Sequence, residues 1–291
     1  MAPATLVNVC GPGRSGTTML DLMLGTPAEA FSCGEAVAAF QPRRPEHAHL
    51  VCSCGEDPCP VWERLRAGPA EQFHRRVADT LGVERVIDSS KWFGWVRDAN
   101  RWGADSGMRV VNLLIWKEPL ELAFSWWKRG ELPADEEAIW CYVQYHARLL
   151  DAGFPVVSVP YADLADDPAG VLASTCRAIG LPYEPGQERF WTTQHHNLFG
   201  SSRARRTLRA SDATIRRTEP SQEFLEATGP PAQRPTRSSP ASSTGCGPAR
   251  RPDVLHANPP ARRSSSRAAG ARLPQRHRHA RAHARDVHPG R

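Results

Sequence analysis

The C-terminal part of this chain, residues 230–291, lacks phenylalanine, tyrosine and tryptophan, although the whole chain contains 9, 4 and 9 of them. The segment holds ten prolines and 13 arginines against two aspartates, for a net charge of +11, which leaves −5 on the rest of the chain. A segment so poor in apolar side chains buries too little surface to offset the entropy of ordering its backbone. We therefore predict a folded domain over residues 1–229 and a basic, low-complexity, disordered tail over residues 230–291.

Lysine is nearly absent: Lys91, Lys117 and Lys128 are the only lysines among the 37 basic residues. An excess of arginine over lysine indicates a GC-rich gene. Such a gene read out of frame yields the Arg, Pro, Ala, Ser, Gly and His that fill residues 230–291. We therefore favour a frameshifted C-terminus. A native disordered tail and a basic arm that binds nucleic acid remain the alternatives.

Long hydrophobic runs are also missing. No apolar stretch approaches the roughly 20 residues that a membrane-spanning helix needs. The N-terminus has no basic segment ahead of its short apolar run, so no targeting signal is expected. The eight cysteines are mostly irregular in spacing, which fits a reducing compartment. We expect a cytoplasmic protein without a membrane span.

Short apolar, β-branched runs alternate with amphipathic segments before the tail. The runs are ATLVNVC, RVIDSS, RVVNLLIW and FPVVSVP. Helical spacing of apolar residues follows the first run and recurs in four later segments. These are residues 69–81, 118–129, 134–151 and 168–179. Strands that alternate with helices predict an α/β fold, in which helices cover both faces of a parallel sheet.

The stretch CGPGRSGTTML follows the first apolar run and has the G-x-x-x-x-G spacing of a phosphate-binding loop, but lacks its lysine. Between a strand and a helix, such a turn points backbone N–H groups and the positive end of the helix dipole at one phosphate. We therefore predict a P-loop-type fold in which Ser15, Thr17 and Thr18 add hydroxyl donors and Arg14 adds a charge beside Gly16. Thr17 in place of the lysine argues against hydrolysis of a nucleoside triphosphate. The alternative is a tight turn that only begins a helix.

The segment GPGRSGTT resembles the 5′-phosphosulfate-binding loop of sulfotransferases that use 3′-phosphoadenosine 5′-phosphosulfate (PAPS). The resemblance extends to IWKEPLELAFSWWKR, in which Lys117, Ser125 and Arg129 have the spacing of the family's 3′-phosphate site. A basic residue at a strand end and a serine two turns along the next helix can converge on one phosphate, with Arg129 on the same face. Lysine stands where the family usually has arginine, which implies a weaker, single-point contact. The alternative is an ordinary amphipathic helix with solvated ends.

Two further motifs supply candidate catalytic residues. SCGEAVAAF resembles the CGE segment of tyrosylprotein sulfotransferases and related bacterial enzymes, which implies that Glu35 is the base that removes the acceptor proton. Lys91 in VIDSSKW follows a predicted strand, at the edge where open α/β sheets bind ligands. The resemblance implies that Lys91 lies near the sulfate and stabilises the leaving oxygen. The alternatives are a solvated glutamate and a surface lysine.

The resemblance covers about residues 6–224. VPYADLADDP and CRAIGLPYE resemble a strand with its Y-x-D-L and the closing helix of the family. HHNLFGSSRAR resembles the segment that folds over the nucleotide, which implies that Gly200, Ser202 and Arg203 reach the 3′-phosphate. The glycine–asparagine pair of the family is not reproduced there.

A cysteine cluster lies outside these motifs, in HAHLVCSCGEDPCPVW. It comprises Cys52, Cys54 and Cys59, with His47 and His49 just upstream, and resembles an insertion in many bacterial sulfotransferase-like proteins. Soft ligands this close together can bind zinc, but the paired C-x-x-C spacing of common zinc sites is missing. A zinc site, a local disulfide and free thiols around a glycine turn all remain open. The segment could shape the acceptor pocket.

These features together predict a sulfotransferase that moves a sulfuryl group from PAPS to a hydroxyl of an acceptor, with no metal required. The acceptor class is open, because a sugar, phenol, lipid headgroup or peptide tyrosine each presents a hydroxyl; nucleic acid is not expected as a partner, and the oligomeric state is not predicted. A P-loop kinase or nucleotide hydrolase is the first alternative, but it needs a lysine at Thr17 and an acidic strand end for Mg²⁺, for which only Asp88 is available. A non-catalytic basic binding protein is the second and rests on the tail alone.

Overall fold

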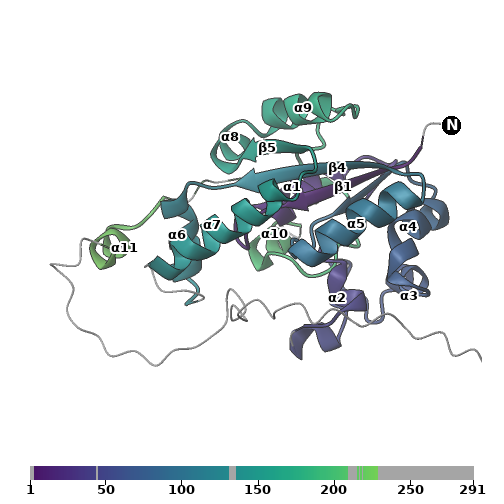
Figure 1. Ribbon diagram of the computed structural model, residues 1–291, viewed down its shortest axis with the longest axis horizontal. Helices are drawn as coiled ribbons and strands as arrows, with labels where there is room; N and C mark the ends of the chain where they lie inside the picture. The colour runs from purple at the N-terminus through teal and green to yellow at the C-terminus, as the bar shows by residue number, and fades with distance from the viewer. Residues whose placement is uncertain are drawn as a thin grey trace, which may run out of the picture. The chain divides into compact units, whose positions relative to one another are not determined.

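Five parallel strands form one sheet at the centre of the domain, in the order β2-β3-β1-β4-β5 (Figure 1). In this computed structural model the described residues are 3–43, 45–130, 136–208, 215, 217 and 219–228. The strands are β1 (Thr5–Cys10), β2 (Ala30–Ser32), β3 (Arg85–Asp88), β4 (Arg109–Trp116) and β5 (Val156–Pro160). The sheet confirms the predicted α/β class, while the predictions for residues 230–291 lie outside the described residues.

Helices cover both faces of the sheet. They are α1 (Thr17–Leu24), α2 (Val37–Phe40), α3 (Pro60–Leu65), α4 (Phe73–Leu81), α5 (Phe93–Asp105), α6 (Pro119–Trp127), α7 (Glu136–Asp151), α8 (Tyr161–Asp166), α9 (Pro168–Ala178), α10 (Ser202–Thr207) and α11 (Gln222–Ala227). Figure 1 shows α8 and α9 on one side of the sheet and α4 and α5 on the other. No helix among these described segments is both long and apolar enough to cross a membrane.

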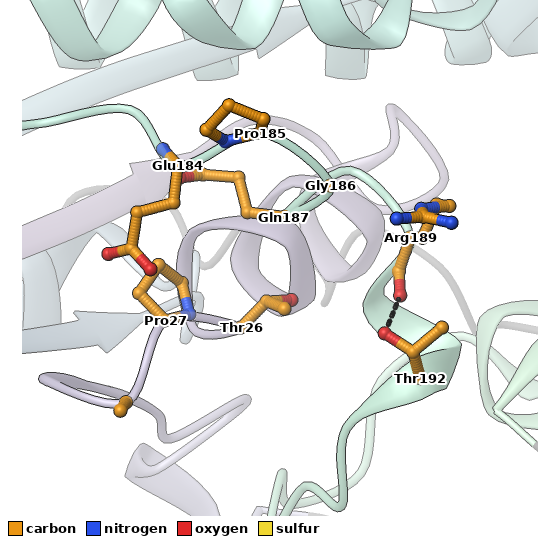
Figure 2. Close-up of a pocket in the computed structure, with 9 residues that line it drawn as sticks. Thr26, Pro27, Glu184, Pro185, Gly186, Gln187, Arg189 and Thr192 are labelled. Atoms are coloured by element: carbon orange, nitrogen blue, oxygen red, sulfur yellow. Dashed lines mark hydrogen bonds between the residues drawn. The ribbon is translucent and has the colours of Figure 1, made fainter.

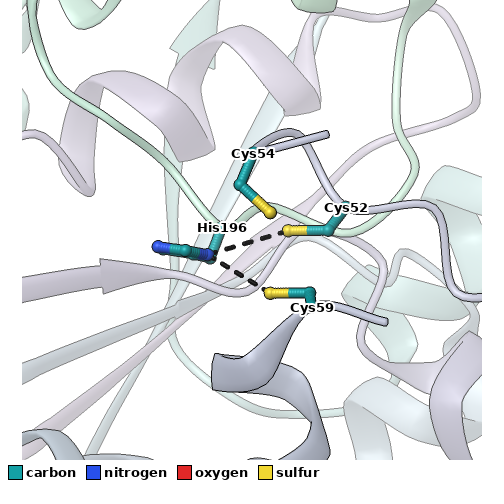
Figure 3. A group of neighbouring side chains, drawn as sticks. All are labelled: Cys52, Cys54, Cys59 and His196. Atoms are coloured by element: carbon teal, nitrogen blue, oxygen red, sulfur yellow. Dashed lines mark hydrogen bonds between the residues drawn. The ribbon is translucent and has the colours of Figure 1, made fainter. Parts of the chain in front are cut away.

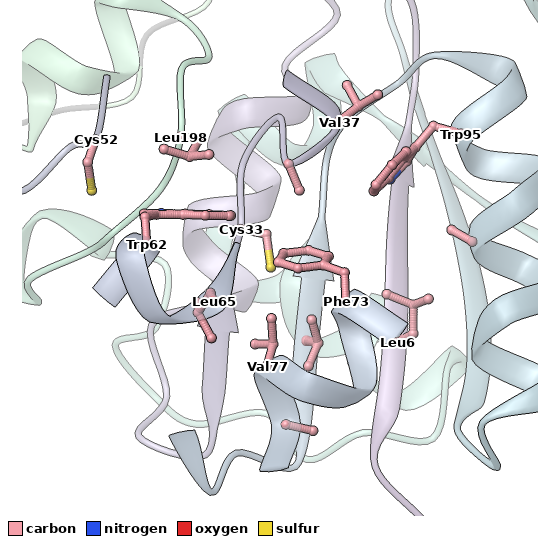
Figure 4. Packing of buried hydrophobic residues seen from close by; sticks show 14 of the residues in the cluster. Leu6, Cys33, Val37, Cys52, Trp62, Leu65, Phe73, Val77, Trp95 and Leu198 are labelled. Carbon is pink, nitrogen blue, oxygen red and sulfur yellow. The ribbon is translucent and has the colours of Figure 1, made fainter. Parts of the chain in front are cut away.

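Alternate side chains of the central strand build two separate hydrophobic cores. Leu6 of β1 packs in a core with Trp62, Phe73 and Trp95, which come from α3, α4 and α5 (Figure 4). Val7, the next residue, faces the opposite core, which α1, α8 and α9 complete. Burial on both faces explains why β1 reads as a nearly continuous apolar run rather than an alternating one.

The predicted helical segments correspond to α4, α6, α7 and α9, but α5 and β2 were not predicted. The sequence of α5, FGWVRDANRWGAD, contains two glycines and three large aromatic side chains, which lower helix propensity. The helix forms because Trp95 and Ala99 are buried in the core shared with α4. β2 is only three residues long and is formed by pairing with β3, which local sequence does not reveal.

A buried carboxyl group joins four segments of the domain. Oδ2 of Asp21, in α1, accepts hydrogen bonds from Ser32 Oγ (3.0 Å), Ser89 Oγ (3.1 Å) and Asn197 Nδ2 (2.6 Å). Burial raises the pKa of Asp21 to about 8, and the nearby charge of Asp88 adds to the rise, while the hydrogen bonds only partly oppose it. Near neutral pH the folded protein therefore keeps this group protonated.

We predict that Asp21→Asn removes a loss of stability that the parent protein suffers as the pH rises. Between the ordinary pKa near 4 and about 8, the folded state holds a proton on Asp21 that the unfolded state has released, so stability falls by up to about 1.4 kcal/mol per pH unit. Asparagine keeps an oxygen for the three donors and never ionises. Denaturant unfolding at several pH values measures the effect.

The matched control is Asp79→Asn, because Asp79 is exposed on α4 and forms a surface ion pair with Arg75, one turn earlier in the helix. This control should leave the pH dependence of the free energy of unfolding as it is. Equal slopes for Asp21→Asn and the parent protein would contradict the assignment.

Candidate functional site

The glycine-rich turn lies at the carboxyl end of β1 and leads directly into α1. Gly16 has φ 111°, and a Cβ atom there would lie 2.6 Å from Cδ2 of Tyr161, so only glycine fits. A Cβ atom on Gly11 would lie 2.4 Å from the carbonyl oxygen of Ile115. The loop is therefore held tightly against the end of β4 and the start of α8.

The Ser15 hydroxyl lies inside this turn. It is buried and has no hydrogen-bond partner within the part of the chain that the structure describes. A buried hydroxyl without a partner costs about 1–3 kcal/mol, so such a group is usually satisfied by a ligand or water. Thr18 Oγ1 accepts a hydrogen bond from the Ser201 backbone N–H (3.0 Å), which brings a distant segment onto the loop. The turn thus has the donors of an anion site.

A second basic site begins where β4 ends. Lys117 Nζ donates to Ser125 Oγ of α6 at 3.3 Å and lies 4.1 Å from the centre of the Tyr161 ring. Arg129 Nη2, beyond the end of α6, donates to Ser202 Oγ of α10 at 3.3 Å. The structure therefore brings Lys117 and Ser125 together, and joins Arg129 to the segment that contains Ser202.

Positive charges accumulate around Lys117. Its pKa is lowered to about 8, mainly by burial; the charge of Glu121 opposes the shift, and the charges of Lys128, Arg203 and Arg14 add to it. We call Arg14, Lys117, Lys128, Arg129 and Arg203 the cation cluster. Burial also lowers the pKa of Lys128, with Arg203 and Arg129 adding to the effect. The shifts in pKa show that these cations lie close enough to repel one another.

The two predicted catalytic side chains are in direct contact. Lys91 Nζ donates to Glu35 Oε1 at 2.6 Å, and both side chains are partly exposed. Glu35 follows β2, and its backbone N–H donates to the carbonyl of Leu198 at 2.9 Å. Lys91 follows β3 in the left-handed backbone region, with φ 60°. The ion pair thus lies at the same edge of the sheet as the glycine-rich turn.

Tyr145 of α7 connects this ion pair to the turn, a role that sequence reasoning missed. Its buried hydroxyl accepts a hydrogen bond from the Gly11 N–H (2.9 Å) and donates one to the carbonyl of Lys91 (2.9 Å). Burial raises the pKa of Tyr145 well above its ordinary value, so the hydroxyl stays protonated. No local pattern could have indicated this contact, because Tyr145 lies within an ordinary amphipathic helix.

Asp88 was the only acidic residue at a strand end that the sequence suggested as an Mg²⁺ ligand. Both of its carboxylate oxygens already accept hydrogen bonds from the protein. Burial disfavours its charge, but hydrogen bonds from His74, Ser90 and Trp95 outweigh burial and lower the pKa of this carboxyl. Oδ2 accepts from His74 Nε2 (2.7 Å) and Trp95 Nε1 (2.8 Å), and Oδ1 from the N–H and hydroxyl of Ser90. Asp88 therefore holds the end of β3 in place and presents no free oxygen.

The three clustered cysteines gather around a histidine that was not predicted. Cys52, Cys54, Cys59 and His196 have ligand atoms that all lie within 4.8 Å of one another (Figure 3). The sequence had pointed to His47 and His49. Neither joins the group, because the His47 ring packs on Phe199 instead, with centroids 4.9 Å apart, and His49 is exposed.

A surface hollow elsewhere on the domain is separate from this site. Residues of the turn after α1 and of the segment after α9 line it (Figure 2): Thr26, Pro27, Ala28, Glu184, Pro185, Gly186, Gln187, Arg189 and Thr192. The glycine-rich turn meets the opposite end of α1, about 12 Å away for a helix of eight residues. The hollow therefore contributes no residue to the anion sites.

Solved structures with a similar fold are sulfotransferases. The sulfotransferase domain from the curacin biosynthetic pathway matches with TM-score 0.52 and 17% identity, over 77% of this chain and 96% of that one. The sulfotransferase domain of the Synechococcus PCC 7002 olefin synthase matches with TM-score 0.50 and 16% identity, over 66% and 79%. The chain has the fold of a sulfotransferase domain. No protein-family model matches it, and no curated protein matches its sequence.

Within this sulfotransferase fold, the resemblance drawn from the motifs is confirmed for the architecture. The structure also brings together the residues that the motifs singled out, as the Lys117–Ser125 and Glu35–Lys91 contacts demonstrate. The roles of these residues in binding and catalysis stay predictions.

We predict that Tyr145→Phe destabilises the domain by about 1–3 kcal/mol, because it leaves the buried Gly11 N–H and the Lys91 carbonyl without their partner. Denaturant unfolding measures the loss. Tyr183→Phe is the matched control, since its hydroxyl donates to the partly exposed carboxylate of Glu188, which water can also reach. If the two variants lost equal stability, the connecting role of Tyr145 would be wrong.

Proposed function

We propose that this protein is a sulfotransferase that transfers a sulfuryl group from PAPS to an acceptor hydroxyl. The observation that carries the proposal is the placement of the glycine-rich turn and the cation cluster side by side at one edge of the sheet. The glycine-rich turn fits one phosphate, and the cation cluster fits a second. The sulfotransferase fold of the domain supports the same assignment.

The two anion sites are close neighbours. The Tyr161 ring packs against Gly16 and lies 4.1 Å from Lys117 Nζ, so it touches both. Trp126 Nε1 of α6 donates to the carbonyl of Gly13 at 2.9 Å and fixes α6 against the turn. A nucleotide with phosphates at two separate positions suits this arrangement better than one with a single phosphate chain.

The kinase and hydrolase alternatives lack their required parts. Thr17 stands where the phosphate-binding lysine is needed. Asp88 is enclosed by four donors and offers no oxygen to Mg²⁺. Sulfuryl transfer from PAPS needs neither feature.

Two groups of residues would bind the two ends of the PAPS donor. The backbone N–H groups of the turn, with Arg14, Ser15, Thr17 and Thr18, would hold the 5′-phosphosulfate. The 3′-phosphate would bind in the cation cluster, where Lys117, Ser125, Arg129 and Arg203 supply charge and donors.

The ion pair would carry out the chemistry. Glu35 accepts the proton of the acceptor hydroxyl while that oxygen forms a bond to sulfur. The bond between sulfur and the bridging phosphate oxygen breaks, and Lys91 stabilises the charge that develops on that oxygen. Glu35 then returns its proton to water. The contact with Lys91 holds the Glu35 carboxylate in one position before the acceptor arrives.

We predict that Glu35→Gln lowers turnover by roughly 10²–10⁴-fold, because the amide cannot accept the proton. The measurement is release of 3′-phosphoadenosine 5′-phosphate from PAPS across a panel of sugars, phenols and tyrosine peptides. Affinity for the product nucleotide should stay unchanged, since Glu35 lies outside the anion sites. Glu71→Gln, at an exposed position, is the control. Full turnover of Glu35→Gln would remove Glu35 from the reaction.

Lys117 gives the donor site a specific pH dependence. With its pKa lowered to about 8, Lys117 loses its charge above that pH in the free protein and must regain a proton to pair with a phosphate. We therefore predict that affinity for 3′-phosphoadenosine 5′-phosphate falls by up to about tenfold per pH unit above about 8. Lys117→Arg should abolish the fall, because arginine stays charged. Calorimetric titration measures both.

Lys128→Arg is the matched control and should retain the fall, because it leaves Lys117, the group with the pKa of about 8, in place. ATP–Mg²⁺ titrated under the same conditions tests the function itself. Preference for the bisphosphate supports the proposal, whereas binding of ATP–Mg²⁺ alone would favour the kinase alternative and overturn it.

A further inference from the structure

Four soft ligands converge at a point that the transfer reaction does not use. Cys52, Cys54 and Cys59 come from one short segment, and His196 comes from another more than a hundred residues later. Figure 3 shows the three thiols and the imidazole directed toward a common centre. His196 Nδ1 lies 3.9 Å from Cys52 Sγ and 3.3 Å from Cys59 Sγ.

These distances match the edges of a zinc tetrahedron. With Zn–S near 2.3 Å and Zn–N near 2.0–2.1 Å, neighbouring ligand atoms lie about 3.5–3.8 Å apart. The ligand atoms here are at most 4.8 Å apart, so shifts of about 1 Å or less would bring all four onto one ion. Three thiolates and one imidazole form a donor set that zinc prefers.

The backbone around the group is already fixed in position. The N–H of Ser53 donates to the carbonyl of Asn197 (2.9 Å), and the Ser53 hydroxyl accepts from the N–H of Asn197 (3.0 Å). Trp62 Nε1 donates to the carbonyl of His196 (2.6 Å), and Arg205 Nη2 donates to that of Cys52 (3.1 Å). The two segments therefore hold the ligands in place from both sides.

A disulfide explains less of this arrangement. It would join two sulfurs at about 2.05 Å and leave the third thiol and His196 without a role. In the structure all three cysteines are free thiols, and Cys52 and Cys59 are buried.

We propose that Cys52, Cys54, Cys59 and His196 bind a structural zinc ion. Four protein ligands complete the coordination, so no position remains for substrate and the site is structural rather than catalytic. Binding releases the thiol protons as the thiolates form. The prediction that sulfuryl transfer requires no metal concerns the reacting centre and does not apply to this structural site. The zinc proposal does not rest on the proposed transfer activity.

The zinc ion would stabilise the segment that completes both parts of the functional site. Two residues beyond His196, the Leu198 carbonyl accepts from the Glu35 N–H (2.9 Å). Further along, the Ser201 N–H donates to Thr18 Oγ1 (3.0 Å) in the glycine-rich turn. Loss of the ion would therefore loosen the contacts of Glu35 and Thr18 at once.

Metal analysis of the full chain, purified under reducing conditions without added chelator, tests the proposal. We expect one zinc ion per chain in the parent protein and a loss of nearly all of it in Cys59→Ser and His196→Ala. Cys176→Ala is the matched control, because Cys176 is a buried free cysteine in the other core, and it should keep its zinc.

A second measurement separates a lost ligand from a lost fold. His196→Cys replaces the imidazole with a fourth thiolate and should retain zinc, whereas His196→Ala should not. The metal-depleted parent protein titrated with Co²⁺ should show the thiolate charge-transfer and ligand-field bands of a tetrahedral site. Protein free of zinc that gives no such bands with Co²⁺, or a disulfide among Cys52, Cys54 and Cys59 under reducing purification, would overturn the proposal.

Discussion

The hydrogen bond between Asn197 and the buried carboxyl group of Asp21 is the contact on which the arrangement of the site depends. Asp21 lies one turn beyond the glycine-rich turn, and the same oxygen accepts from Ser32 and Ser89 at the ends of β2 and β3. These strands lead to Glu35 and Lys91, respectively. One buried oxygen thereby fixes the relative positions of the glycine-rich turn, the two candidate catalytic residues and the segment that contains Asn197.

The charges around Lys117 are the electrostatic feature on which the proposed anion site rests. The cation cluster gathers five basic side chains near the end of β4 and α6, and its members already lower the pKa of Lys117 and Lys128. Such mutual repulsion is a cost in the folded state that a bound anion relieves. Burial of Lys117 strengthens the effect, since a partly desolvated charge interacts more strongly with a phosphate than an exposed one does.

Sequence predicted the parts of the molecule in which local pattern determines structure. The glycine-rich turn between β1 and α1 is local, and Lys117 and Ser125 are eight residues apart on a strand end and the following helix. Contacts between distant segments were not predictable. Tyr145 meets Gly11 and Lys91 only after α7 packs on the sheet, and His196 reaches the cysteines only after the 195–205 segment crosses the domain.

The α5 helix illustrates the same limit for the fold. Its glycines and aromatics give it a weak intrinsic preference for the helical state, and burial of Trp95 against Trp102 and Phe40 stabilises it. Tertiary packing overrides propensity in this segment, as it does in the three-residue strand β2.

The late position of the 195–205 segment has a consequence for how the protein is made. The ribosome synthesises the glycine-rich turn almost first, but Asn197 and Ser201, which complete its surroundings, emerge some 180 residues later. Throughout most of translation, the carboxyl group of Asp21 therefore lacks its shortest hydrogen bond. The glycine-rich turn can thus reach its final surroundings only after the 195–205 segment has been synthesised.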